Sequence, residues 1–524
     1  MTNSSRIIFA GLLALGLAAC SEPQSPQATS YDLILRGGTI VDGSGDPAYV
    51  GDIAINGEVI VAIGELGNSS GSEEIDVSGL VVAPGFLNIH SHASKEGIST
   101  AVNMLSQGVT TEIINADGYG QGYLTDQLAD FAEDGLALNL GGMVGFNAVW
   151  RDVVGLGLVR PNTVQISEMQ SKILENLEAG AWGVSAGLDY VPGYYATTEE
   201  VIEILSPFAD WNVVFANHDR VTPESGFSSI AGMTETLEIG EGSGLIPLVT
   251  HMKVQGWEQG QVETILTRMR ETDTNFTGGA VADVYPYLAG LTGLQALIIP
   301  SWAQAGGRDA MLARFAQDDL RAQIREEAEE AMRLRFGGPS GVFLLGSQRE
   351  LTDVMTELEE QSAAEAVIRV LEETEEIIIA RFGLEDDLVA IMQHQTASIA
   401  CDCGAQSPEV EFTHPRNWGS YPKVLGEFVR DKQDLTLEDA IYKMTGLPAR
   451  TIGMTDRGLL KPGMVADITV FDPATVIDRA TYAEPTLQSE GIVHTLLNGQ
   501  FGWRDGAATG LQAGKILTRP LPAL

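Results

Sequence analysis

The amino-acid sequence predicts an α/β fold: a (β/α)8 TIM-like barrel, a small β domain built from both chain ends, and a helical insertion before the last barrel strand. Three observations support this prediction. Eight short apolar runs alternate with helical patterns through the middle of the chain. Both ends show short β-like runs bounded by Gly and Asn. A long acidic stretch with a helical pattern separates the last two apolar runs.

Length and charge limit the possible functions. The 524 residues are enough for one large domain and a smaller one. The formal net charge of −40 argues against a nucleic-acid partner, because phosphates would be repelled. Many acidic residues fall within residues 317–376 among Ala, Leu and Arg, and we interpret them as exposed faces of helices. The oligomeric state is left open.

Residues 1–19 are predicted to be a signal peptide. Arg6 precedes an apolar run, residues 7–17, that is too short to span a bilayer. The sequence Leu17-Ala18-Ala19-Cys20 resembles the lipobox of bacterial lipoproteins, which implies lipidation of Cys20 and a tether over residues 20–30. We therefore expect an exported lipoprotein, anchored to a membrane and facing the periplasm. An ordinary cleaved signal with an incidental Cys is the alternative, and it also exports the chain.

The small β domain is predicted from residues 31–83 together with residues 455–524. Its β-like runs are residues 32–38, 51–55, 59–64, 463–471 and 491–499. Because the runs at both ends show the same pattern of short β-like segments bounded by Gly and Asn, we expect them to pair in one domain.

Residues 84–454 are predicted to form the barrel. Its eight strand candidates are residues 82–89, 109–114, 137–144, 182–186, 213–216, 246–250, 280–284 and 398–400. Helical patterns such as residues 163–179 and 261–272 fall between them. In a barrel of this kind the chemistry gathers at the C-terminal ends of the strands. Residues 301–395 are expected to be a mostly helical insertion that covers the mouth.

Reactive side chains follow the predicted strands, and four of the seven histidines are among them. The residues at these positions are His90, His92, Asp117, His218, Asp219, Arg220, His251, Lys253, Tyr285, Tyr287, Cys401, Asp402 and Cys403. His90 and His92 point the same way, since side chains alternate along a strand. Each residue alone could be a cap or a turn residue, but together they predict a metal site.

Histidine and carboxylate ligands around a divalent ion indicate hydrolysis. Such an ion lowers the pKa of its bound water toward neutrality and can polarise a carbonyl. A carboxylate beside that water can accept its proton and deliver it to a leaving group. Asp402, after the last predicted strand, has the residue type and the position for this role.

Cys401 and Cys403 stand one residue apart, where they are poorly placed to bridge each other. We therefore expect no disulfide to hold the protein together, although an exported protein could form one. The two thiols are interpreted as structural, with contact to a metal as the alternative.

The chain resembles the amidohydrolase superfamily and, more narrowly, the N-acyl-D-amino-acid deacylases (D-aminoacylases). Ala83-Pro84-Gly85-Phe86 followed by the His-X-His pair is shared across the superfamily, whereas residues 183–196 and 414–426 are more specific. Further matches are residues 218–220, 251–253, 283–287, 445–450 and 458–463. The resemblance runs from about residue 31 to beyond residue 471, and it implies the barrel and the two-ended β domain.

The resemblance also implies zinc, as one or two ions, with another divalent metal as the alternative. His218 and His251 match ligands of a tight site, and His90 and His92 match a second, weaker position. Asp117 stands where better-known members have a Cys ligand, and a carboxylate is a harder ligand than a thiolate. Asp402 matches the catalytic acid/base.

Other positions match residues that hold the substrate carboxylate. Lys253 and one of Tyr285 and Tyr287 have this role by resemblance, with Arg220 and Arg416 as further candidates. The predicted function is therefore metal-dependent hydrolysis of N-acyl-D-amino acids or similar small amides. Alternatives are the opening of cyclic amides, cleavage of dipeptides with a D residue, or an inactive metal- or ligand-binding lipoprotein. The fourth predicted strand carries no lysine, which argues against a hydantoinase-like carboxylated-lysine bridge.

Overall fold

The computed structural model describes residues 30–407 and 409–521. The predicted signal peptide, the lipidation site Cys20 and the tether up to residue 29 lie outside the described residues. Within the described ranges, no helix combines the length and the apolar character needed to cross a membrane.

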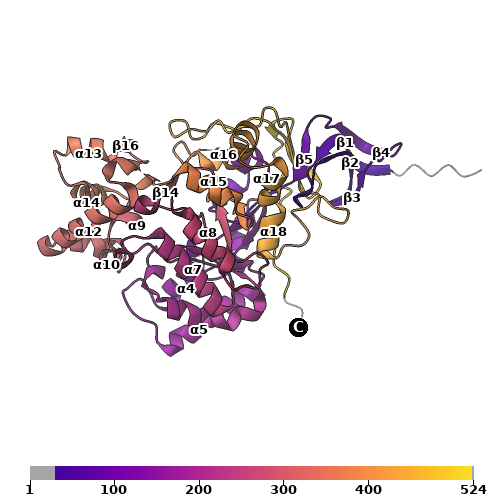
Figure 1. The fold of residues 1–524 in the computed structure, drawn as a ribbon. Coiled ribbons are helices and arrows are strands. Elements are labelled where there is room, and N and C mark those ends of the chain that lie inside the picture. Colours follow the sequence, from indigo (N-terminus) through magenta and orange to yellow (C-terminus); the bar gives the residue numbers. More distant parts are fainter. Residues whose placement is uncertain (1–29, 408, 522–524) are drawn as a thin grey trace, which may run out of the picture.

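Eight parallel strands form the barrel, which lies between the insertion and the small β domain in Figure 1. The strands are β6 (Phe86–Asn88), β7 (Val109–Ile114), β8 (Asn139–Gly142) continued by β9 (Val144–Gly145), β10 (Gly183–Gly187), β11 (Val214–His218), β12 (Ile246–Val249), β13 (Val281–Val284) and β18 (Ala397–Ile399). A parallel bridge between Ser91 and Cys403 links the last strand to the first. Each of the eight predicted runs overlaps one of these strands, so the barrel prediction is confirmed.

The helices that follow these strands pack around the barrel. The side chain of Asn162 accepts hydrogen bonds from the backbone N–H groups of Val164 and Gln165, which explains why the predicted helix begins at Thr163. The barrel helices are α1 (Lys95–Ile98), α2 (Val102–Leu105), α3 (Leu124–Ala132), α4 (Phe146–Val153), α5 (Thr163–Glu178), α6 (Thr198–Leu205), α7 (Ser229–Ser243), α8 (Val262–Glu271), α15 (Glu385–Gln393), α16 (Arg416–Lys423), α17 (Leu437–Met444) and α18 (Gly446–Ile452).

A nine-stranded sheet joins the two ends of the chain, as predicted. Its strands are β1 (Ser30–Ile40), β2 (Tyr49–Asn56), β3 (Val59–Gly64), β4 (Ser70–Asp76), β5 (Val81–Pro84), β19 (Ile468–Phe471), β20 (Ile492–Leu497), β21 (Gln500–Arg504) and β22 (Ala507–Ala508). Strand β5 connects the two halves, because it pairs with β1 on one side and with β19 on the other.

Gly85 divides the predicted run of residues 82–89 between two sheets. Strand β5 before it belongs to the small β domain, and strand β6 after it begins the barrel. A Cβ atom at Gly85 would lie 2.2 Å from Oγ1 of Thr110, so only glycine fits this crossing.

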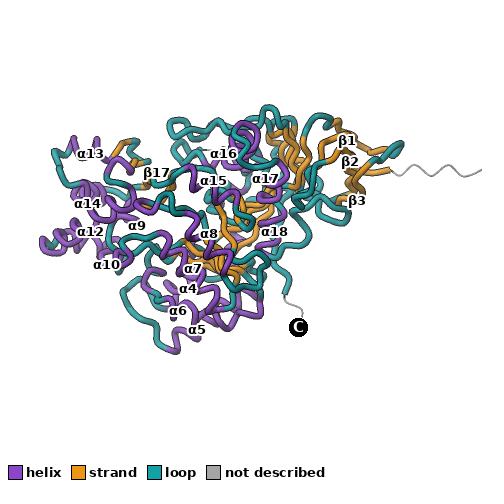
Figure 2. Tube along the Cα trace, in the orientation of Figure 1, coloured by secondary structure: helices purple, strands orange, loops and turns teal. Residues whose placement is uncertain are grey.

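The insertion between β13 and α15 carries its own apolar core. Its helices are α9 (Leu294–Ile298), α10 (Ser301–Gln304), α11 (Arg308–Phe315), α12 (Asp318–Phe336), α13 (Leu351–Glu357) and α14 (Ala363–Glu373). It also contains a small antiparallel sheet that we did not predict, made of β14 (Ala289–Gly293), β15 (Val342–Leu344), β16 (Arg349–Glu350) and β17 (Ile377–Arg381). Three consecutive isoleucines at the start of β17 favour a strand over a helix. Figure 2 shows this mostly helical insertion at the end of the molecule opposite the small β domain.

Candidate metal centre and catalytic site

The predicted metal ligands converge at the C-terminal ends of the barrel strands. His90 and His92 follow β6, Asp117 lies in the turn after β7, His218 ends β11 and His251 follows β12. Four of these five residues are buried, and the His92 side chain is 33% exposed. Asp402, also buried, follows β18.

Three of these residues adopt the left-handed backbone conformation, with φ of +56° at Asp117, +32° at His251 and +49° at Asp402. This conformation costs a residue with a Cβ atom about 1–2 kcal/mol, so the surrounding structure must enforce it. At these three positions the left-handed conformation turns the chain sharply after the strand, so that the side chain faces the barrel mouth.

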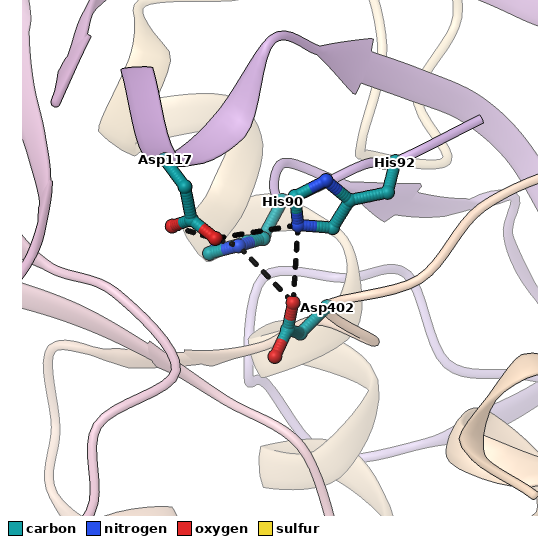
Figure 3. A group of neighbouring side chains, drawn as sticks. All are labelled: His90, His92, Asp117 and Asp402. Carbon is teal, nitrogen blue, oxygen red and sulfur yellow. Dashed lines mark ion pairs between the residues drawn. The ribbon is translucent and has the colours of Figure 1, made fainter. Parts of the chain in front are cut away.

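One group of candidate ligands consists of His90, His92, Asp117 and Asp402 (Figure 3). Nε2 of His92 lies 3.4 Å from Oδ2 of Asp117 and 3.2 Å from Oδ1 of Asp402. Nε2 of His90 lies 3.5 Å from Oδ1 of Asp117 and 3.4 Å from Oδ1 of Asp402. The four side chains thus surround one small volume from three strand ends.

The second group consists of Asp117, His218 and His251. Nε2 of His251 lies 2.7 Å from Nδ1 of His218 and 3.5 Å from Oδ1 of Asp117. Asp117 is therefore common to both groups, and its carboxylate would contribute to both sets of ligands.

Two features of the residues fit a divalent metal. Within residues 30–407 and 409–521, buried Nε2 of His90 and buried Oδ1 of Asp117 have no hydrogen-bond partner. Leaving such atoms without a partner is costly, and a cation would remove that cost. Imidazole and carboxylate donors also suit zinc and similar borderline ions.

Asp283 connects the two groups behind the ligands, and the sequence reasoning assigned it no role. Its Oδ2 lies 3.3 Å from Nδ1 of His90, and its Oδ1 accepts a hydrogen bond from the backbone N–H of His251 at 2.6 Å. A carboxylate in this position orients a ligand imidazole so that Nε2 faces the metal. The sequence signal that could have pointed to this role is an acidic residue, Asp283, within the otherwise apolar strand β13.

Burial and neighbouring charges set the protonation of these groups. Burial lowers the pKa of His251 well below its usual value, and the Lys253 ammonium adds to this effect, so the imidazole is neutral as a metal ligand must be. Burial alone would raise the pKa of Asp117, but the imidazoles of His90 and His251 hold it well below its usual range. Burial likewise opposes ionisation of Asp402, yet Arg416 and the neighbouring imidazoles keep its pKa far below the usual range.

A cavity of about 300 Å³ opens between this centre and the insertion. Lys253, Tyr285 and Arg416 line it beside the predicted ligands. The Lys253 ammonium lies 2.9 Å from Nδ1 of His251, and Nη1 of Arg416 donates to Oδ2 of Asp402 at 2.6 Å. The Tyr285 hydroxyl is buried and has no hydrogen-bond partner in the described part of the chain.

Arg220 and Tyr287 are not brought into this cavity. The Arg220 guanidinium pairs with Glu235 and donates to the backbone oxygens of Tyr194 and Ala196. The Tyr287 hydroxyl donates to Asp478 at 3.2 Å. Their predicted contact with substrate therefore has no support from the geometry.

Cys401 and Cys403 form a disulfide, so the prediction that they do not bridge is wrong. The prediction rested on their spacing of one residue, which does not show how the backbone turns between them. The left-handed turn at Asp402 brings them to 4.9 Å, within the usual range for a disulfide. The bond brackets Asp402.

Comparisons with known proteins agree with the geometry. The amidohydrolase family model matches residues 412–501. A D-aminoacylase of Alcaligenes xylosoxydans xylosoxydans is 32% identical over 93% of this chain and 98% of its own length. A solved D-aminoacylase is 28% identical with a TM-score of 0.78, and the match covers 93% of this chain and all of that one (100%).

A second solved structure is an N-acyl-D-glutamate deacylase of Bordetella bronchiseptica, complexed with zinc and a phosphonate that mimics the tetrahedral intermediate. It is 27% identical with a TM-score of 0.77, over 93% of this chain and 100% of that one. With its barrel, its two-ended β domain and its similarity over nearly the whole length, the chain belongs to the D-aminoacylase family of amidohydrolases.

Proposed function

We propose that the protein is a zinc-dependent hydrolase that cleaves the amide bond of N-acyl-D-amino acids. The observation that carries this proposal is the position of ionised Asp402 beside two ligand groups that share Asp117, facing a cavity that also contains Lys253. The D configuration of the substrate is inferred from the relatives, a D-aminoacylase and an N-acyl-D-glutamate deacylase.

The residues present would hold one or two zinc ions. His218, His251 and Asp117 would bind one, and His90, His92 and Asp117 a second. When bound, the metal supplies activation of a water molecule and polarisation of the acyl carbonyl. Strand β10 contributes no lysine that could form a carboxylated-lysine bridge, so a cyclic-amide reaction of the hydantoinase type is not favoured. Asp117 would instead be the ligand that the two metal groups share.

Asp402 would move the proton. Its Oδ2 is held by Arg416, whereas its Oδ1 lies toward His90 and His92. One carboxylate oxygen is therefore fixed and the other remains available to accept a proton from water and pass it to the departing amine. Its low pKa keeps it ionised at neutral pH, which is the form a base requires.

Lys253 is suited to bind the substrate carboxylate. Three cationic side chains line the cavity, namely Lys253, Arg335 and Arg416. Arg416 is paired with Asp402, and Arg335 donates to Asp189 at 2.5 Å. Among the described residues, Lys253 is the cavity cation without a carboxylate within ion-pair distance, so it can take the substrate's.

The remaining cavity wall favours an apolar substrate side chain. The insertion contributes Leu291, Leu297, Ile377, Ala380 and Phe382 to it. A second carboxylate on the substrate would meet Arg335 in this wall, but the guanidinium of Arg335 is already paired with Asp189, and burying a charge without a free partner is costly. We therefore propose acylated D-leucine, D-methionine or D-phenylalanine as substrates in preference to acylated D-glutamate.

The experiment that tests this function compares the wild type with Asp402→Asn. We expect the wild type to release amino acid from N-acetyl-D-amino acids, and Asp402→Asn to lose at least about 100-fold in kcat, as for loss of a general base. Zinc content should stay close to that of the wild type. Asp210→Asn makes the same chemical change at an exposed surface position and should be fully active. Full activity of Asp402→Asn would refute the role of Asp402, and an inactive, zinc-loaded wild type would refute the function.

We further propose that the protein is an exported lipoprotein, on the support of the signal-like residues 7–17 and of Cys20 after Ala18-Ala19. The Cys401–Cys403 disulfide agrees with an oxidising compartment. In a bacterial host, the wild type should fractionate with membranes, whereas Cys20→Ser should be released with the soluble proteins. Identical fractionation of the two would contradict lipidation at Cys20.

A further inference from the structure

We infer that the Cys401–Cys403 disulfide is a positioning element for Asp402, and that its reduction slows hydrolysis by loosening the general base. This inference rests on the proposed function, because it concerns the residue that moves the proton. Neither cysteine is itself a candidate metal ligand, but both are bonded to Asp402, which belongs to one ligand group, so the disulfide would act mainly through Asp402.

The disulfide closes a small ring that contains the whole backbone of Asp402. Asp402 has φ of +49°, a conformation that an aspartate leaves readily unless the chain around it is constrained. With the bond intact, Cys401 and Cys403 fix both sides of this residue. With the bond broken, the backbone of Asp402 loses this covalent constraint and is held by hydrogen bonds and by the packing of the buried cysteines.

Both ends of the ring are attached to strand β6, which carries the metal ligands. The Asn88 side chain accepts from the backbone N–H of Cys401 at 3.2 Å and donates to the backbone oxygen of Cys403 at 3.1 Å. The backbone N–H of His92 donates to that same oxygen at 3.0 Å. The ring therefore fixes the position of Asp402 relative to the His90–His92 pair.

The carboxylate of Asp402 is sensitive to small shifts of this backbone. Its two oxygens serve different partners, Arg416 on one side and the imidazoles of His90 and His92 on the other. A rotation that keeps the short contact to Arg416 would move Oδ1 away from the imidazoles. Displacements of about 1 Å at a reacting group are enough to lower rates by about 100-fold.

The disulfide borders the cavity on the side of Cys403. Cys403 lines the cavity, although only 3% of its surface is exposed, and Cys401 is fully buried behind it. A phosphine can attack a sulfur from the cavity: the S–S bond breaks, the phosphine takes an oxygen atom from water, and the two sulfurs take two electrons and two protons. The products are a phosphine oxide and two thiols.

The test uses the full chain with Cys20→Ser, so that Cys401 and Cys403 are its only cysteines. Zinc-loaded protein is assayed before and after treatment with a water-soluble phosphine, and thiols are counted after denaturation. We expect no thiols before treatment and two after it, with kcat for an N-acetyl-D-amino acid reduced at least about tenfold. KM and zinc content should change by less than about threefold, and reoxidation should restore kcat.

The matched variant is Cys401→Ser/Cys403→Ser, which should have the low kcat of the reduced protein and be insensitive to the phosphine. A reduced protein with two free thiols and a kcat within about twofold of the oxidised form would overturn the inference. If no form hydrolyses any N-acyl-D-amino acid, the proposed function fails, and the cobalt(II)-loaded proteins then decide the inference. The visible spectrum of the cobalt(II)-loaded oxidised protein should differ from that of the cobalt(II)-loaded double serine variant. Identical spectra would overturn the inference.

Discussion

Asp117 belongs to both groups of candidate metal ligands, and its carboxylate oxygens lie 3.4–3.7 Å from imidazole nitrogens of His90, His92, His218 and His251. A single neutral substitution at this residue would therefore weaken both metal positions at once. His90 is a different case. Burial alone would lower its pKa, but Asp283 and Asp117 raise it well above the usual value.

Asp117→Asn should bind less than half the zinc of the wild type after dialysis. Its hydrolysis of N-acetyl-D-amino acids should fall at least about 100-fold, because a neutral amide is a poor ligand for zinc. Metal content is measured by elemental analysis on the same sample as the activity, with Asp210→Asn as the exposed control. A variant that retains the full zinc content would show that Asp117 is not a ligand.

The individual ligands could be predicted from the sequence because each one follows an apolar run, and parallel strands place these ends together. Two features of the site could not. Asp283 lies within a buried strand, where an acidic residue gives no sign of which neighbour it meets. The disulfide depends on the left-handed backbone of Asp402, which spacing along the sequence does not reveal.

At the scale of elements, the loop after β18 is held by the first two barrel strands. Glu112 on β7 accepts hydrogen bonds from the backbone N–H of Ala405 at 3.1 Å and from the side chain of Asn88 on β6 at 3.2 Å. Glu112 is fully buried, and burial raises its pKa from 4.5 to about 7. The loop that carries Asp402 is therefore attached to a carboxyl group that is costly to ionise.

This burial predicts a pH-dependent stability. Because the folded-state pKa of Glu112 lies above its unfolded value, the folded protein binds more protons between pH 4.5 and 7, and its stability falls as the pH rises through this window. The loss reaches about 3 kcal/mol above pH 7, at 1.36 kcal/mol for each pKa unit. The side chain of Glu112→Gln does not titrate, so the stability of this variant should not fall in this window. Exchanging the carboxyl group for an amide also changes a hydrogen bond, but that change in stability does not depend on pH.

Urea unfolding of the wild type and Glu112→Gln at pH 5 and pH 8 measures the effect. The free energy of unfolding of the variant, relative to the wild type, should increase between the two pH values. A difference that stays constant from pH 5 to pH 8 would show that the pKa of Glu112 is not raised.

The insertion and the barrel meet through a buried ion pair. Arg335 on α12 donates to Asp189 after β10, and the two side chains are 4% and 2% exposed. The ring of Tyr190, the next residue, packs against the ring of His218 at a tilt of 52°, with ring centroids 4.4 Å apart. The insertion thus contacts the chain directly beside a metal ligand, which explains how a segment remote in sequence forms one wall of the cavity.

The eight barrel strands and the helices at residues 163–179 and 261–272 could be predicted because apolar periodicity and capping residues are local signals. The sheet inside the insertion could not be predicted, because 83 residues lie between β14 and β17, which pair with each other. Neither segment alternates between apolar and polar residues clearly enough to predict a strand by itself. The predicted strand of residues 82–89 is divided by Pro84-Gly85, and its two parts belong to different sheets.

At the scale of the whole molecule, the cavity lies between the barrel mouth and the insertion, and the small β domain lies on the other side of the barrel (Figure 1). The described chain begins with strand β1 of that domain, on the side of the barrel away from the cavity. The chain has a formal charge of −40, and among the described residues Lys253 is the cavity cation without a paired carboxylate, which gives an anionic substrate a favourable place to bind.

The most direct test of the proposed function is the hydrolysis of a matched substrate panel by zinc-loaded protein, with the metal counted on the same sample. The panel contains N-acetyl-D-leucine, N-acetyl-L-leucine, N-acetyl-D-glutamate and a hydantoin. We predict that kcat/KM for N-acetyl-D-leucine exceeds that for each of the others by at least about tenfold, since 1.36 kcal/mol in the transition state is a factor of ten. No release of leucine from N-acetyl-D-leucine, or faster opening of the hydantoin, would contradict the account.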